Sequence, residues 1–428
     1  MSCRPGVTLI VVALLLPLVG ADGLARRTRR PGTPRPHPIP NSRTIPLAAD
    51  LYDSQRRGPG DYAAVSERQA VQIFRSATGS APGIRFDSRR PELGIQRYVS
   101  SRTATPASVR QVSSGKSGAR VFFVKQGRRT SVLKVFGGVE TMLREAAAIQ
   151  TVKRQGLEHL HTARLLGVTL ATDDRGRQVG ATLQSKAPGR SIDDQMSRAG
   201  QARGADREAR VSRLAEMARH VAVGLAELHS KSAGRRLTRR DKMDNDVVWF
   251  QQTWRALKRN PRLDANLLAS LDAGMQRVVD SYLEAPIRGS ITHGDARGAN
   301  FFVDGKNRVT MIDNETLMRS VFKGAGVGSF AGDVGRFIET TAIVGREKNM
   351  TPREVSRIQR AFLFAYRRNA GEGLAPRPSF RAATRFFQVN MAAVALKNDL
   401  RDYPRVEPGR LPSYQRLLQL LRPASHGR

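Results

Sequence analysis

The sequence predicts an α+β protein with two lobes, an antiparallel β lobe followed by a mainly helical lobe. Residues 121–124 and 131–136 are apolar, β-leaning runs joined by a basic turn at residues 126–129, which is typical of a hairpin. Residues 139–152 follow with apolar side chains at helical spacing. The same spacing predicts seven further helices, at residues 207–230, 246–259, 264–283, 333–343, 352–368, 380–399 and 412–421.

Composition divides the chain into five segments. We expect a signal peptide (1–21), a flexible basic linker (22–60), an N-terminal extension (61–105), the β lobe (106–186) and the helical lobe (187–428). The linker is rich in Pro, Arg and Gly and lacks apolar periodicity, so it has little with which to form a core. The extension contains one helical pattern, at residues 62–77.

The N-terminus has the features of a secretory signal. Residues 7–19 form an unbroken apolar run behind Arg4, and residues 19–21 are small enough for a cleavage site. Thirteen apolar residues are short for a membrane span, which favours cleavage and a secreted or periplasmic protein. Four arginines at residues 26–30 argue for the alternative, an uncleaved anchor that leaves both lobes in the cytoplasm.

The net charge of +35, from 72 Lys and Arg against 37 Asp and Glu, predicts attraction to anionic partners. The other interpretation is a charge spread over the whole surface without a dedicated partner. No basic stripe is interleaved with aromatic residues, which argues against nucleic acid, and membrane contact is expected only if the N-terminal segment stays uncleaved. The single cysteine, Cys3, lies in the expected signal, so the mature chain can form no disulfide.

Polar residues with informative spacing cluster in residues 290–315. Asp295 precedes Asn300 by five residues, on a loop that follows an apolar strand. Residues 300–303 and 309–312 then read as two short strands, and the second delivers Asp313 at its end. This spacing can place a substrate hydroxyl and a metal ion side by side. His293 is interpreted as a scaffold residue that bonds nearby backbone.

A buried cation is predicted upstream of this motif. Lys134 lies within the apolar run 131–136, and a lysine there needs an anionic partner. Glu145 follows eleven residues later on the apolar side of the predicted helix 139–152 and is the expected partner, with Glu140 as its rival. Ahead of the hairpin, a small-residue loop offers backbone approach and charge to phosphate oxygens through Ser114, Gly115, Lys116 and Gly118.

In combination these motifs resemble the aminoglycoside phosphotransferase and choline kinase group of the protein-kinase-like fold. The resemblance rests on His293-Gly294-Asp295 with Asn300 and Ile312-Asp313. Three further segments are similar to that group: the hinge-like residues 187–191, the helix VAVGLAELH at residues 221–229, and Gly332-Asp333 before a helix. The match runs from about residue 112 to about residue 344. It departs from the group at Arg297, often His there, and at Asn314, usually aromatic.

The resemblance implies an ATP- and Mg²⁺-dependent phosphotransferase that acts on a hydroxyl of a small molecule or protein. Asp295 would be the catalytic residue, Asn300 and Asp313 the metal ligands, and Lys134 with Glu145 would bind the nucleotide phosphates. Asp333 would be structural. Three alternatives remain: transfer of AMP or another group, a nucleotide-binding pseudokinase, and a basic protein that binds nucleic acid or membrane.

Two expectations concern the acceptor side of this site. The helices within residues 246–283 are expected to line the acceptor cleft. Trp249 and Trp254 are interpreted as core or packing residues rather than as a ligand cage.

Overall fold

The computed structural model describes residues 69–70, 72–73, 77, 83–86, 95–98, 108–112, 119–173, 175–322 and 325–422. The chain divides into two units, Met1–Ile45 and Pro46–Arg428, and every described residue belongs to the second. The signal and linker segments lie outside the described residues. So does the small-residue loop with Ser114, Gly115, Lys116 and Gly118.

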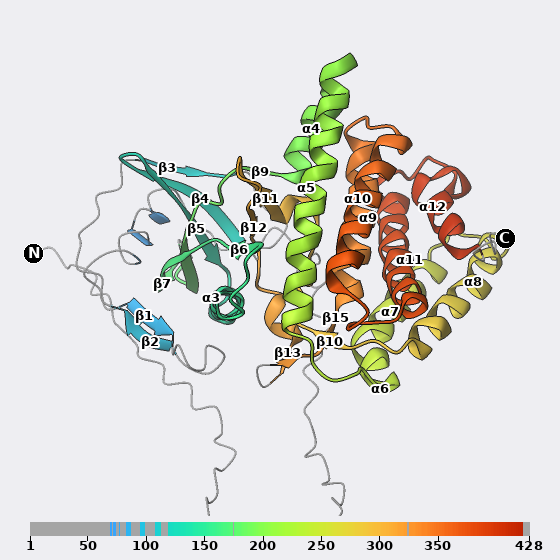
Figure 1. The fold of residues 1–428 in the computed structure, drawn as a ribbon, viewed down its shortest axis with the longest axis horizontal. Coiled ribbons are helices and arrows are strands. Elements are labelled where there is room, and N and C mark those ends of the chain that lie inside the picture. Colours follow the sequence, from blue (N-terminus) through green and yellow to red (C-terminus); the bar gives the residue numbers. More distant parts are fainter. Residues whose placement is uncertain are drawn as a thin grey trace, which may run out of the picture. The chain divides into compact units, whose positions relative to one another are not determined.

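A five-stranded antiparallel sheet forms the first part of the described fold, with strand order β3-β4-β5-β8-β7. Its strands are Ser108–Gln111 (β3), Ala119–Gln126 (β4), Arg129–Phe136 (β5), Leu165–Thr172 (β7) and Gln178–Ser185 (β8). Gly127, with φ +56°, opens the two-residue turn between β4 and β5, where a positive φ favours glycine. The predicted hairpin is therefore present (Figure 1).

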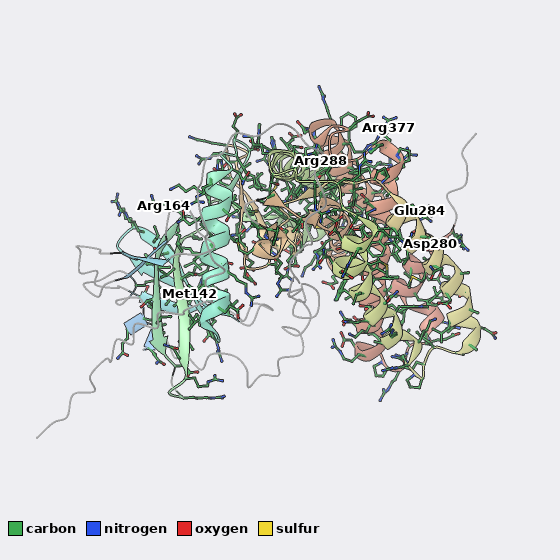
Figure 2. The ribbon with its side chains drawn as sticks, turned by 90° about the horizontal axis from the view of Figure 1, so that it is seen from below. Met142, Arg164, Asp280, Glu284, Arg288 and Arg377 are labelled. Atoms are coloured by element: carbon green, nitrogen blue, oxygen red, sulfur yellow. The ribbon has the colours of Figure 1, made fainter. Side chains whose placement is uncertain are left out.

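Helix α3 (Val139–Arg154) buries Met142, Ala146, Ile149 and Val152, the stripe expected from helical spacing. Met142 and Ala146 pack on this sheet, and Val152 joins the core of the helical lobe. Gly180 on β8 makes the close approach possible, since a Cβ there would lie 2.7 Å from the Met142 side chain. Figure 2 shows Met142 beside the strands. The sheet also belongs to a second apolar cluster, which contains Phe122, Leu133 and Val179. The N-terminal extension contributes Ala70, Ile73 and Ala77 to this cluster.

Four short strands form a second sheet that carries the polar motif. Its order is β6-β12-β11-β9, built from Leu160–Thr162 (β6), Arg190–Ser191 (β9), Phe301–Val303 (β11) and Val309–Met311 (β12). Strands β11 and β12 pair antiparallel, so Phe301 faces Met311 across the hairpin. Strand β6 pairs parallel with β12 and ties this hairpin to the segment that follows helix α3.

The remaining described chain is mainly helical. The helices are Ile192–Gln201 (α4), Gly204–Lys231 (α5), Arg239–Lys242 (α6), Val248–Lys258 (α7), Ala265–Glu284 (α8), Phe330–Glu347 (α9), Pro352–Ala370 (α10), Arg377–Asp402 (α11) and Pro412–Leu421 (α12). Helix α10 packs against α5 and α9, and α11 packs against α9 (Figure 1). Stacked rings of Phe337, Phe362, Tyr366 and Phe380 fill the core between them.

Short paired strands complete the description. They are Gly83–Phe86 (β1) with Ile95–Tyr98 (β2), Gly289–Ser290 (β10) with Gly328–Ser329 (β15), and Val321–Phe322 (β13) with Ala325–Gly326 (β14). Among the helices described, none has the length and apolar character to cross a membrane.

The architecture confirms the predicted fold class, an antiparallel β lobe followed by a helical lobe. The helices predicted from residue 139 onward are present, although the helix expected from residue 333 begins at Phe330 and a π turn at Met243–Val247 precedes α7. Most of the helical pattern at residues 62–77 lies outside the described residues. Strand β7 and helix α4 were not predicted. Strand β7 is a short apolar segment whose state depends on pairing with β8. Helix α4 is short and mostly polar, buries only Ile192, Met196 and Ala199, and packs against α5.

Candidate active site

Lys134 lies at the centre of a buried group of charges. It projects from β5 and is only 4% exposed. Its Nζ donates to Glu145 Oε1 at 2.9 Å and to Asp313 Oδ1 at 2.5 Å. Glu145 is fully buried, whereas Glu140 is exposed and pairs with Arg144, so Glu145 is the partner that the helical spacing predicts. One lysine thus joins the β lobe to the strand end that carries Asp313.

The two partners hold Lys134 charged. Burial alone would lower the pKa of Lys134, but the carboxylates of Asp313 and Glu145 raise it above the ordinary value. Burial likewise acts to raise the pKa of Asp313, and Lys134 outweighs it, so the pKa of Asp313 falls below its ordinary value. Both groups are therefore ionised at neutral pH and present a fixed pattern of charge.

Glu315 is a third carboxyl in this group, and the sequence reasoning missed it. Burial, with the nearby charges of Glu145 and Asp313, raises its pKa well above the ordinary value. The Oε2 atoms of Glu145 and Glu315 are buried without a hydrogen-bond partner among the described residues. Gln184 also donates to Glu145, at 3.0 Å. The sequence feature that could have identified Glu315 is its spacing, because it follows Asp313 by two residues.

Asp295 is held by hydrogen bonds from Arg336 and Asn300 and by an ion pair with Arg297. Arg336 Nη1 on helix α9 lies 2.8 Å from Asp295 Oδ1, and Arg297 Nε lies 3.1 Å from Oδ2. Asn300 Nδ2 donates to the same carboxylate at 3.1 Å and to the Asp295 carbonyl at 2.8 Å. The sequence predicted the proximity of Asp295 and Asn300 but not Arg336, which is 41 residues away along the chain.

His293 has the scaffold role that was expected of it. Its Nε2–H donates to the Ile312 carbonyl at 2.8 Å, so in the neutral ring Nδ1 accepts the Asp295 N–H at 3.2 Å. We call residues 293–300 the catalytic loop. The His293 ring therefore links this loop to the strand that delivers Asp313. Thr316 reinforces the link by donating to the His293 carbonyl.

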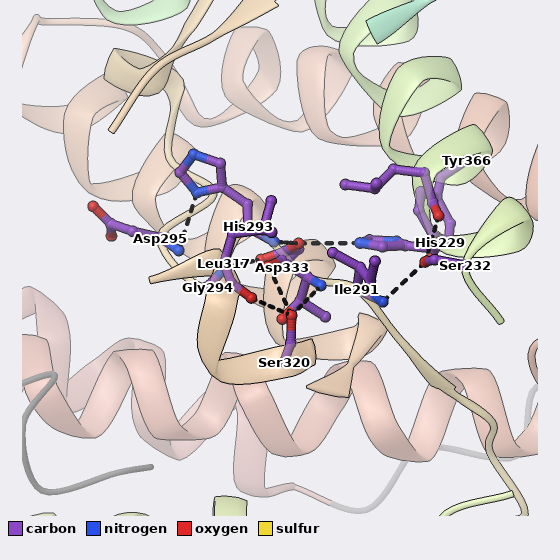
Figure 3. A network of polar contacts seen from close by, with 12 residues as sticks. His229, Ser232, Ile291, His293, Gly294, Asp295, Leu317, Ser320, Asp333 and Tyr366 are labelled. Atoms are coloured by element: carbon purple, nitrogen blue, oxygen red, sulfur yellow. Dashed lines mark hydrogen bonds and ion pairs between the residues drawn. The ribbon is translucent and has the colours of Figure 1, made fainter. Parts of the chain in front are cut away.

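Asp333 anchors the catalytic loop, and Figure 3 shows it between His293 and His229. Its carboxylate accepts the backbone N–H groups of His293 at 2.7 Å and Gly294 at 2.8 Å, and His229 Nε2–H at 3.0 Å. His229 Nδ1 in turn accepts the Tyr366 hydroxyl at 2.7 Å. Burial would raise the pKa of Asp333, but the contacts with His229 and His293 bring it below its ordinary value. This buried hydrogen-bond network supports the structural role expected of Asp333.

The backbone brings Asn300 and Asp313 to neighbouring ends of the β11–β12 hairpin. Ile312 N–H donates to the Asn300 carbonyl at 3.0 Å, which sets the two ends of the β11–β12 hairpin side by side. Because Asn300 uses Nδ2 to bond Asp295, its Oδ1 is left for a cation. Asp313 has φ +58°, an uncommon conformation for a residue other than glycine and one that functional sites often retain.

The side-chain oxygens of Asn300 and Asp313 suit Mg²⁺ better than a metal ion whose ligands all come from the protein. Within the part of the chain that the structure describes, no group of three or more His, Cys, Asp or Glu side chains could surround a metal ion. Magnesium is usually bound by one or two carboxylates, with waters and substrate phosphates as the other ligands. The amide of Asn314, beside Asp313, is buried without a hydrogen-bond partner, as expected where a ligand completes the site.

A pocket of about 120 Å³ adjoins the catalytic loop on the side of helices α7, α9 and α11. Gly294 and Arg336 connect it to Asp295, while Trp249 and Phe387 provide aromatic walls. Trp249 of α7 lines this pocket, whereas Trp254 is a core residue, which corrects the expectation that both are core or packing residues. The described lining includes Asp246 and Trp249 but no residue of α8, which packs against α11 and α12. That the helices within residues 246–283 line the acceptor cleft stays a prediction.

The fold and this site define a protein-kinase-like phosphotransferase, with a strand lysine, a helix glutamate and a catalytic loop in the order that phosphoryl transfer uses. The model of the phosphotransferase enzyme family matches residues 108–368, more than half of the chain. The chain therefore belongs to that family. A search of curated protein sequences finds no match.

Several solved structures are similar to this chain. A glucosamine kinase in complex with glucosamine, ADP and inorganic phosphate is 16% identical, with 76% of this chain and 84% of that chain covered and a TM-score of 0.47. An aminoglycoside-3′-phosphotransferase of type VIII is 20% identical over 64% and 92% of the two chains, with a TM-score of 0.40. A spectinomycin phosphotransferase with ADP and its antibiotic is 11% identical over 84% and 95%, with a TM-score of 0.42. Likenesses this distant do not identify the acceptor.

Proposed function

We propose that the protein transfers the γ-phosphate of ATP to a hydroxyl group of a small molecule, with Mg²⁺ as the metal. The observation that carries this proposal is the contact of Lys134 with both Glu145 and Asp313, beside a catalytic loop that holds Asp295 and Asn300 together. Such an arrangement positions charge for phosphates on one side and orients a hydroxyl on the other.

Each group then has a role. Lys134, held by Glu145, contacts the nucleotide phosphates, and Asp295 orients the acceptor hydroxyl and takes its proton. Asn300 and Asp313 would hold Mg²⁺, which when bound neutralises the charge on the phosphate oxygens. The loop at residues 113–118 stays a predicted phosphate contact, outside the described residues.

We assign the pocket of about 120 Å³ beside the catalytic loop to the acceptor and call it the acceptor pocket. It supports a narrower proposal, that the acceptor carries no ammonium group. Each carboxylate at the pocket already has a donor: Asp246 accepts the Tyr282 hydroxyl at 2.5 Å, Asp333 holds the catalytic loop, and Asp295 pairs with Arg336. Burial also raises the pKa of Asp246 to about 7, despite the hydroxyl of Tyr282 and the charge of Lys242, so much of its charge is absent at neutral pH.

What lines the pocket suits a neutral or acidic alcohol with an apolar face. Arg319 brings a guanidinium group to the lining, and Trp249 and Phe387 can stack against a sugar ring. Asn390 also lines the pocket, is 1% exposed, and both polar atoms of its amide lack a partner among the described residues. A buried unpaired amide costs about 1–3 kcal/mol, a cost that a bound hydroxyl can offset.

The proposal is tested by incubating the purified chain and Mg²⁺ with γ-labelled or α-labelled ATP and three sugars on one scaffold that differ in charge at one carbon: glucose, glucosamine and glucuronate. We expect γ-label in the product and faster transfer to glucose or glucuronate than to glucosamine. Transfer of α-label alone would identify a nucleotidyl transferase. Nucleotide binding without any labelled product would identify a pseudokinase. Preference for glucosamine would contradict only the narrower proposal.

Asn390→Leu is the matched variant, because it keeps the side-chain volume and removes the unpaired amide. We expect the acceptor KM to rise about tenfold while the free energy of unfolding stays equal or increases by about 1 kcal/mol. An unchanged KM would remove Asn390 from the acceptor site.

For location, we propose export with cleavage after Ala21, on the strength of the apolar run at residues 7–19. N-terminal sequencing of the natural product decides it. A full-length, membrane-retained chain would favour the anchored alternative.

A further inference from the structure

A second pocket lies between helix α10 and the start of α11, and it shares no lining residue with the acceptor pocket. Its volume is about 580 Å³, within the range of small-molecule sites. We call it the arginine pocket, because its lining includes Arg360, Arg367, Arg368 and Arg377. Arg377 is labelled in Figure 2.

The charge of this pocket is not balanced by the protein. Arg360, Arg367, Arg368 and Arg377 form no ion pair with a carboxylate in the described part of the chain, and Glu372 is the one acidic residue in the described lining. On the same helix, by contrast, Arg357 pairs with Glu208 of α5. Arginines on α10 are therefore paired where the helix meets α5 and left unpaired around the pocket. Clustered guanidinium groups favour a carboxylate or phosphate between them.

The same pocket is also apolar. Phe364 is 68% exposed at its edge, the largest exposed fraction among the bulky apolar side chains described. Phe380 and Leu374 are buried in its wall, and Arg367 lies 6.0 Å from the centre of the Phe380 ring. Exposed aromatic surface in a concave site is typical of a place where a ligand covers it. A bare anion would satisfy the arginines and leave this surface in water.

We propose that the arginine pocket binds an anionic amphiphile, a carboxylate or phosphate head group on a hydrocarbon chain. The head group lies among the four arginines, and the chain covers Phe364 and the apolar wall. The spacing of Arg360, Phe364, Arg367 and Arg368 places both halves of the recognition on one face of α10. The ligand reaches the protein either free in solution or from an anionic bilayer.

Calorimetric titration of the full chain with decanoate tests the proposal, with decanol and inorganic phosphate as probes that each lack one half of the ligand. The pocket variant is Arg360→Gln with Arg368→Gln. The control is Arg353→Gln with Arg381→Gln, which removes the same charge from exposed positions of α10 and α11 outside the pocket. We expect decanoate to bind at least about tenfold more tightly than either partial probe.

The pocket variant should weaken decanoate at least about tenfold, and the control less than about twofold. Equal losses in both variants would assign binding to bulk charge and overturn the proposal. Inorganic phosphate binding as tightly as decanoate would reduce the pocket to a plain anion site. Co-sedimentation with phosphatidylcholine vesicles containing phosphatidylglycerol, without decanoate, tests an anionic bilayer as the source of the ligand. If the protein binds these vesicles and the pocket variant binds them equally well, the proposal is also overturned.

Discussion

The catalytic loop and the charged group around Lys134 lie side by side, but the protein satisfies their polar atoms differently. Both ring nitrogens of His293 and both oxygens of Asp333 have partners within the chain. The Oε2 atoms of Glu145 and Glu315 are buried without a hydrogen-bond partner among the described residues, and so is the amide of Asn314, next to Asp313 in the chain. The chain itself therefore provides the partners that anchor the loop backbone, whereas polar atoms in and next to the charged group are left for a ligand.

This comparison is sharpened most by removing Asp313. Asp313→Ala should reduce kcat by at least about 10³-fold, on the order of 4 kcal/mol, because a metal-held carboxylate is lost. Stability should change little, since Lys134 keeps Glu145 as its partner. Turnover and nucleotide-induced thermal shift are the measurements. Equal nucleotide affinity and thermal shift in both proteins would contradict the assignment.

Removing Asp333 should act in the opposite way. Asp333→Ala leaves two buried backbone N–H groups and His229 without their acceptor, so the free energy of unfolding should fall by about 3 kcal/mol or more. Urea unfolding measures it. Asp244→Ala, at an exposed position, is the control and should be nearly neutral. If the two variants are equally stable, the Asp333 network does not support the loop.

Lys134 and Glu145 should behave as one unit. Lys134→Ala should reduce transfer about 100-fold, and Glu145→Ala should add little to it in the double variant, because the glutamate acts through the lysine. Glu140→Ala, on the exposed side of α3, is the control. A silent Glu145→Ala with a damaging Glu140→Ala would show that the pairing is wrong.

The sequence predicted those parts of the site that local spacing determines. Asp295 and Asn300 lie five residues apart on one loop, and Lys134 and Glu145 follow from one strand and one helix with a clear apolar stripe. The pairing of Lys134 with Glu145 needed only the correct helical face. The fold class followed in the same way, from a hairpin and a series of amphipathic helices.

What the sequence did not predict depends on packing between distant segments. Arg336 reaches Asp295 from helix α9, and Glu315 meets Glu145 of α3 and Lys134 of β5. Trp249 has the sequence context of a core residue but lines the pocket beside the catalytic loop, together with Phe387 and Asn390 of α11. Spacing along the chain carries no information about such contacts.

The smallest expected effect concerns the proton that Glu315 keeps. Its folded-state pKa is raised above 4.5, so between pH 4.5 and that higher value the folded protein holds a proton that the unfolded chain has released. Stability from this group is therefore fully present below pH 4.5 and decreases as pH rises.

Glu315→Gln, which mimics the protonated form, should flatten that decrease between pH 5 and 8, as measured by urea unfolding at each pH. Glu140→Gln is the matched control and should keep the wild-type slope, because its carboxyl is exposed. Asp246, whose pKa is raised to about 7, contributes the same slope to all three proteins, so their difference isolates Glu315. Identical slopes would mean that Glu315 is ionised in the folded protein, and the charged group around Lys134 would then contain three full negative charges before any ligand binds.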